Sequence, residues 1–152
     1  MNDHIRSGIR AGNIFAVVTI FLILIGFEIT ATRLIGGIVG NNTNSAVLNV
    51  VNLLIFFGFL GLFAGATAGK PRDQDTWSGI FLSGLAGGAA YGVLMALFTL
   101  LIGSIHAQGI DMRKYLAALA PSDINFYLFG GTPLNAALIY FGFFVATTLS
   151  GA

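Results

Sequence analysis

Glu28 is a residue whose type and position could do chemistry. It ends an apolar stretch that has carried no charge since Arg10. If that stretch crosses a membrane, an acidic group there is by default a candidate for carrying protons or cations. Arg33 follows five residues later, close enough to pair with this carboxylate at a membrane surface. Glu28 is therefore a candidate ion or proton site, with a solvated or ion-paired structural role as the alternative.

No other set of side chains has the spacing of a catalytic or metal site. His4 and His106 stand far apart, whereas a zinc site needs three or four protein ligands. The stretch from Gly65 to Lys70 has one residue too few between its glycines for a phosphate-binding loop, and Pro71 replaces the required Ser or Thr. The chain has no cysteine, so thiol catalysis is excluded. We expect no enzyme activity, no bound metal and no cofactor.

Glycines recur at every fourth position in two apolar stretches. Four-residue spacing places each set on one face of a helix, where a second helix backbone can come close. Lipid tails are as apolar as leucine, so such close contact is a main source of helix association in a membrane. We expect these two faces to pack on each other, with an interface to another subunit as the alternative. The predicted helix-packing residues are Gly61, Gly65 and Gly69 in one stretch and Gly84, Gly88 and Gly92 in the next.

Stretches without charge are long enough to cross a bilayer four times. Only 9% of the residues are charged and 56% are hydrophobic, whereas about 25% are charged in soluble domains. A helical crossing needs about 20 predominantly apolar residues. The sequence therefore predicts an all-α polytopic membrane protein, with a single transmembrane helical domain over residues 1–152. The predicted spans are residues 9–29, 46–68, 77–105 and 133–149.

Two of the connections are expected to hold short interfacial pieces. Residues 30–40 contain Arg33 and a glycine pair, which is typical of a frayed helix end or a piece lying at the membrane surface. In the third connection, residues 115–119 follow two basic residues. Apolar residues beside basic ones favour a short amphipathic helix in the membrane interface. Thr132 and Pro133 then supply an N-cap and a first helical residue for the last span.

Four crossings place both chain ends on the same side of the membrane. Four positive residues lie on the terminal side and three on the other, a small excess that favours cytoplasmic termini. The net charge of +1 indicates no clustered basic face for nucleic acid. We therefore expect a multi-pass protein of the cell inner (plasma) membrane, with the lipid bilayer and other membrane protein subunits as its partners.

Several short motifs resemble a known membrane region. The motifs are IRSGIRAG at residues 5–12, the glycine-rich third span, IDMR at residues 110–113, APS at residues 120–122 and YLFG at residues 127–130. In this order they resemble the N-terminal membrane region of some bacterial branched-chain amino acid ABC transporter permeases, of the inner-membrane translocator type. The resemblance implies a helical accessory region of an importer, with a separate substrate-binding protein and separate ATPase subunits. None of the translocating core of such a permease is present in these 152 residues, so no functional residue is carried over.

The sequence favours a role in assembly over a role in catalysis. Abundant helix-packing faces without a catalytic site predict a non-catalytic integral membrane subunit that packs into a larger membrane complex. A component of a membrane transporter, such as an ABC-type permease region, is the first alternative. An accessory subunit of a photosynthetic or respiratory complex is the second, because 14 phenylalanines offer contacts for pigments or quinone tails.

Overall fold

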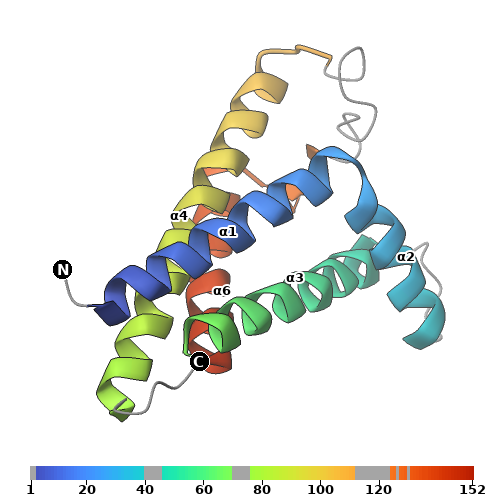
Figure 1. Ribbon diagram of the computed structural model, residues 1–152. Helices are drawn as coiled ribbons and strands as arrows, with labels where there is room; N and C mark the ends of the chain where they lie inside the picture. The colour runs from blue at the N-terminus through green and yellow to red at the C-terminus, as the bar shows by residue number, and fades with distance from the viewer. Residues whose placement is uncertain (1–2, 40–45, 70–75, 112–123, 126, 130) are drawn as a thin grey trace.

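The computed structural model describes residues 3–39, 46–69, 76–111, 124–125, 127–129 and 131–152, and within them the regular elements are all helices. Four of these helices are long and apolar enough to cross a membrane. The prediction of an all-α, four-span membrane protein is therefore confirmed. The interfacial helix predicted at residues 115–119 lies outside the described residues. The helices are α1 (Asp3–Leu24), α2 (Phe27–Val39), α3 (Ala46–Ala68), α4 (Trp77–Ala107) and α6 (Pro133–Gly151) (Figure 1).

The first predicted span consists of two helices and not one. α1 ends at Leu24, and α2 begins at Phe27 after a sharp turn, so the predicted range of 9–29 runs past a helix end. Gly26 makes this turn, because its φ of 71° lies in the left-handed region that side chains disfavour. Its N–H donates to the Ile23 carbonyl at 2.9 Å and closes the last turn of α1. The piece expected after this span is thus a regular helix, which packs on α3.

The four long helices form two pairs that run in opposite directions. α1 and α4 run the same way, since their contacts advance together from Gly8 beside Ser83 to Gly12 beside Gly87. α3 and α6 run the other way, and both end near the first turns of α4 (Figure 1). α4 lies between α1 and α6 and packs along both. The chain therefore starts and finishes at the same end of the bundle.

Aromatic rings fill the centre of the bundle between α3, α4 and α6. Tyr91 stacks on Phe144 with ring centroids 4.1 Å apart, and Phe57 packs against both Phe144 and Tyr140. All four side chains are buried. Stacked and edge-to-face ring pairs contribute about 0.5–1.5 kcal/mol beyond the burial of their area. Ring packing of this kind helps to determine how α4 meets α6.

A hydroxyl pair inside the core joins α1 to α4. Thr19 donates its hydroxyl hydrogen to the Phe15 carbonyl at 2.8 Å, so the Tyr91 hydroxyl is the donor in its close contact with Thr19 Oγ1. Both side chains are fully buried. Because lipid cannot replace a lost hydrogen-bond partner as water would, this bond favours one register of the two helices.

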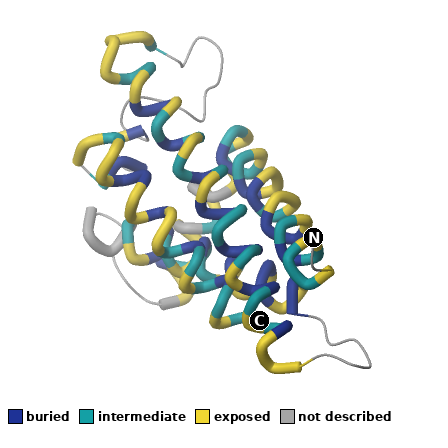
Figure 2. Tube along the Cα trace, turned by 90° about the vertical axis from the view of Figure 1, so that its left-hand side faces the viewer, coloured by how far each residue is buried: buried dark blue, intermediate teal, exposed yellow. Residues whose placement is uncertain are grey.

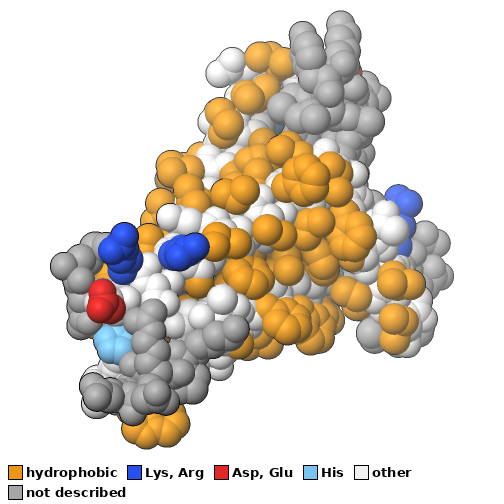
Figure 3. All heavy atoms as spheres, in the orientation of Figure 1, with side chains coloured by type: hydrophobic (Ala, Val, Ile, Leu, Met, Phe, Trp, Pro, Cys, Tyr) orange, Lys and Arg blue, Asp and Glu red, His pale blue; other side chains and the backbone are white. Residues whose placement is uncertain are grey.

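The outer surface carries a broad apolar belt with arginines at its two ends. Exposed Val, Leu, Ile and Phe side chains cover the four long helices, and each helix turns a buried side inward (Figure 2). In Figure 3, orange apolar side chains occupy the middle of the molecule, with blue arginine side chains toward opposite margins. Arg6 and Arg10 lie near the start of α1, and Arg33 lies in α2. This distribution matches a hydrocarbon layer bounded by two polar interfaces.

Tyr91→Phe should remove the hydrogen bond between α1 and α4 while the ring keeps its place against Phe144. We expect a stability loss of about 0.6 kcal/mol, the average for hydrogen bonds between membrane helices. Reversible unfolding of the purified protein in mixed detergent micelles measures this loss. Thr19→Val should also destabilise the protein, and the double variant should lose less than the sum of the two single losses. Strictly additive losses would show that the two hydroxyls do not interact.

Candidate functional site

The glycines of α4 that were predicted to pack helices lie against the backbone of α6. A Cβ atom added at Gly88 would lie 2.8 Å from Val145 Cα, and one added at Gly92 would lie 2.8 Å from the Phe141 carbonyl oxygen. Real Cβ atoms essentially never approach other heavy atoms this closely. At Gly84 the added atom would lie 2.6 Å from the Cβ atom of Ala152, the residue that follows α6. Any side chain at these positions would push α4 and α6 apart.

The glycines of α3 lie against the opposite edge of the same helix. A Cβ atom added at Gly61 would lie 2.7 Å from the Cβ atom of Thr147. At Gly65 it would overlap the main chain at Thr148, and Gly69 meets the residue that follows α6. α6 thus lies between two glycine faces, one at α3 and one at α4, and contacts both.

The prediction that these two faces pack on each other is therefore wrong. Consecutive helices are often neighbours in space, and that expectation paired α3 with α4. α6 instead presents its small residues Thr147, Thr148 and Gly151 to α3, and the glycines of α4 lie against its main chain. α3 and α4 still touch at one end, where Ser83 Oγ donates to the Ala68 carbonyl at 2.7 Å.

Sequence reasoning missed a third close contact, between α1 and α4. A Cβ atom added at Gly8 would lie 2.9 Å from the carbonyl carbon of Ser83, and one added at Gly12 would lie 2.9 Å from that of Gly87. The signal was in the sequence, because each helix offers two small residues four positions apart. The predicted span began at residue 9 and therefore left Gly8 outside it.

One face of α6 carries small residues that no described part of the chain covers. The buried residues of α6 point toward the bundle, whereas Gly142, Ala146 and Ser150 are exposed at four-residue spacing. A Cβ atom added at Gly142 would meet no heavy atom within 4 Å. The Ser150 hydroxyl donates to the Ala146 carbonyl at 2.8 Å, so it is satisfied within the helix. We refer to these three residues as the outer α6 stripe.

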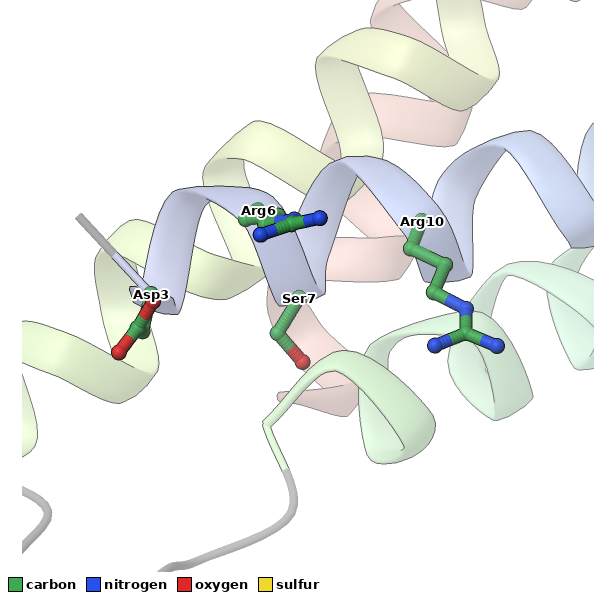
Figure 4. A pocket seen from close by; sticks show the side chains of 4 residues that line it. All are labelled: Asp3, Arg6, Ser7 and Arg10. Atoms are coloured by element: carbon green, nitrogen blue, oxygen red, sulfur yellow. The ribbon is translucent and has the colours of Figure 1, made fainter. Parts of the chain in front are cut away.

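A polar pocket of about 380 Å³ lies at the start of α1 (Figure 4). Asp3, Arg6, Ser7 and Arg10 line it, and their spacing puts them on one face of the helix. In Figure 4, the Ser7 and Arg10 side chains point toward the end of α3, and Arg6 lies across the front of α1. Asp3, Arg6 and Arg10 are exposed, so the described lining of the pocket presents two guanidinium groups and one carboxylate. We call it the arginine pocket.

The remaining sequence candidates do not converge on a site. Glu28 lies in the first turn of α2, beyond the turn that ends α1, and its side chain is not among those described. The His4 ring lies 2.8 Å from the Cβ position of Gly79 at the start of α4, whereas His106 lies in the last turn of that helix. Among the described residues, no group of three His, Cys, Asp or Glu could hold a metal ion.

A narrow crevice lies where α1, α4 and α6 meet the segment that precedes α6. It is too narrow to admit a water molecule. Thr99 Oγ1 donates to the Met95 carbonyl at 2.8 Å, and the Tyr140 hydroxyl donates to the Tyr127 carbonyl at 3.0 Å. The polar groups at this crevice are therefore engaged in the helix bundle itself, and the crevice offers no chamber for a substrate.

Gly12→Ala should destabilise the bundle, because the added methyl group collides with the backbone of α4 at Gly87. Overpacking of this kind typically costs about 1–3 kcal/mol. Gly37→Ala in α2 is the matched control, because a Cβ atom there meets nothing within 4 Å. The control should be neutral or gain up to about 1 kcal/mol from its higher helix propensity. Thermal unfolding in detergent compares the two, and equal stability would contradict the close contact of α1 with α4.

Comparisons with known proteins were made by sequence and by structure. No protein-family model, curated protein or solved structure matches this chain. The resemblance to branched-chain amino acid permeases therefore stays an expectation. The functional argument rests on two features of the molecule, the outer α6 stripe and the arginine pocket.

Proposed function

We propose that this protein is a non-catalytic integral membrane subunit that packs into a larger membrane complex through α6. The observation that supports this proposal is the outer α6 stripe, Gly142, Ala146 and Ser150, which is exposed although it has the composition of a buried contact. The proposed partner is a transmembrane helix of another subunit. Its backbone would lie along the stripe as the backbone of α6 lies along the glycines of α4.

The physical reason is the behaviour of small residues in lipid. Hydrocarbon tails cover large apolar side chains well, so apolar burial alone does not drive helices together there. A stripe of small residues leaves a shallow groove in which a second helix gains close van der Waals contact and Cα–H···O contacts. Within this bundle, Gly88 and Gly92 make a contact of this kind with α6. The outer α6 stripe repeats this four-residue spacing of small residues on the side of α6 that faces away from the bundle.

The outward faces of the other long helices have a different character. Phe21 of α1 is 58% exposed, Phe63 of α3 is 62% exposed and Leu97 of α4 is 57% exposed. Large side chains of this kind suit contact with flexible lipid tails. In α6 itself, large exposed residues such as Leu134 and Leu138 lie no later than Phe141, which is 37% exposed beside Gly142. The second half of α6 is therefore the proposed docking surface.

The proposed location is the inner (plasma) membrane of a bacterium, with cytoplasmic termini. Arg6 and Arg10 lie at the end of the bundle that holds both termini, and Arg33 lies toward the other end. Positive residues flanking membrane helices favour the cytoplasmic side. The outer α6 stripe would then lie in the cytoplasmic half of the bilayer.

Two alternatives place the same subunit in particular assemblies. One is a membrane transporter, which the resemblance to ABC-type permease regions implies, and the other is a photosynthetic or respiratory complex. The proteins that accompany the chain from the membrane distinguish them. Permease and ATPase subunits would identify the first, whereas pigment- or quinone-binding subunits would identify the second.

Ala146→Leu should break the assembly while leaving the bundle intact. A leucine in the middle of the outer α6 stripe holds a partner helix away, yet it points out of the bundle. Purification from membranes in mild detergent, followed by mass spectrometry, measures the partners retained. We expect the native chain to elute in a large, defined complex, and the variant to elute alone with unchanged thermal stability.

Ala66→Leu is the matched control, because Ala66 is also exposed but lies beside the large side chains of α3. It should retain every partner. Loss of partners from both variants would show that a larger side chain disrupts the complex wherever it is placed on the surface, and not specifically at the outer α6 stripe. A native particle that contains this chain alone would refute the subunit proposal.

A further inference from the structure

We propose that Arg6, Ser7 and Arg10 bind the phosphate group of a phospholipid headgroup in the arginine pocket. This site is separate from the outer α6 stripe and does not depend on the subunit proposal. Three features of the described residues support it: the chemistry of the pocket, its depth in the membrane, and the apolar surface that continues from it along α1.

The chemistry of the pocket fits a phosphodiester. Arg6 and Arg10 are separated by one helical turn, about 6 Å along the axis, so their guanidinium groups can reach one anion from two sides. Guanidinium forks donate pairs of hydrogen bonds to phosphate oxygens, and such charge-assisted bonds are among the strongest in proteins. The Ser7 hydroxyl lines the same space as a third donor. Asp3 lies at the outer edge of this face, and among the described lining residues its carboxylate offsets one of the two guanidinium charges.

The depth of the pocket fits the headgroup layer. The pocket residues lie in the first turns of α1, and the next turns carry the exposed apolar residues that begin at Ile14. Gly8 lies beside Ser83, so the pocket is level with the second turn of α4. Trp77, which is 88% exposed, lies farther out at the start of that helix. Indole rings favour the headgroup level of the membrane, and the arginines begin just inside this level, from which their long side chains can reach back to the phosphates.

The surface below the pocket fits acyl chains. Ile14, Val17, Val18 and Phe21 follow Arg10 on the same face of α1, and all four are exposed. A phospholipid with its phosphate in the pocket would lay its tails along this face. A free phosphate ion would gain nothing from it. This continuity favours a lipid over a soluble phosphate as the source of the anion.

The test uses the full chain in detergent, titrated with phosphatidylglycerol and followed by native mass spectrometry. We expect one lipid to bind more tightly than the rest, and Arg6→Gln or Arg10→Gln to weaken this binding about tenfold or more, as loss of a charge-assisted hydrogen bond does. Arg33→Gln is the matched control, since it removes the same charge from α2, outside the pocket. Its affinity for the lipid should stay within about twofold of the native value.

Each arm of the experiment decides one part of the proposal. Equal losses of lipid affinity in all three variants would show that the lipid is held by general charge attraction, and this result would overturn the site. Unchanged binding in both pocket variants would also overturn it. Glycerol 3-phosphate should compete poorly, because it lacks acyl chains, and diacylglycerol should compete poorly, because it lacks phosphate. Competition by glycerol 3-phosphate at the same concentration as the lipid would overturn the assignment to a phospholipid.

Discussion

In hydrocarbon, helices gain little by hiding apolar side chains from their surroundings, so this bundle depends on how closely its helix backbones can approach. Three such approaches organise the fold: α1 on α4 at Gly12, α4 on α6 at Gly88, and α3 on α6 at Gly65. Each uses small residues one turn apart, and each excludes a side chain on at least one helix. Close backbone contacts consequently fill the interior at the end of the bundle that holds both chain termini. Aromatic rings fill the interior nearer the middle of the bundle.

Hydrogen bonds between helices add direction to these contacts. The Tyr91 hydroxyl reaches Thr19 of α1, and Ser83 reaches the Ala68 carbonyl at the end of α3. Backbone contact along a smooth glycine face would permit sliding, whereas a buried hydroxyl has few positions in which its partner is within reach. The two kinds of interaction are therefore complementary, since the glycines set the distance between helices and the hydroxyls set their register.

The sequence was sufficient for the fold class because long charge-free runs have few explanations other than a membrane. It was also sufficient to find the glycine faces of α3 and α4, since four-residue spacing is a property of a single helix. The partner of those faces was not predictable in this way, because it depends on which surface of α6 is turned inward. The turn at Gly26 was missed for a related reason: a glycine in an apolar run marks a packing position as readily as a break, and only its φ separates the two. The arginine pocket needed the structure as well, since Arg6 and Arg10 are ordinary flanking charges until the end of α3 is placed beside them.

The length of α4 has a consequence for how the molecule sits in a membrane. Its 31 residues rise about 46 Å, whereas the hydrocarbon core of a bilayer is about 30 Å thick. Gly84 is level with the end of α6 and Gly103 with its start, so α4 overhangs its neighbour at both ends. In a bilayer whose hydrocarbon core matches the length of α6, these overhangs would lie in the headgroup zones of the two leaflets. A thicker bilayer would cover them with acyl chains, and a thinner one would expose more of them to water, so α4 makes this protein responsive to hydrophobic mismatch.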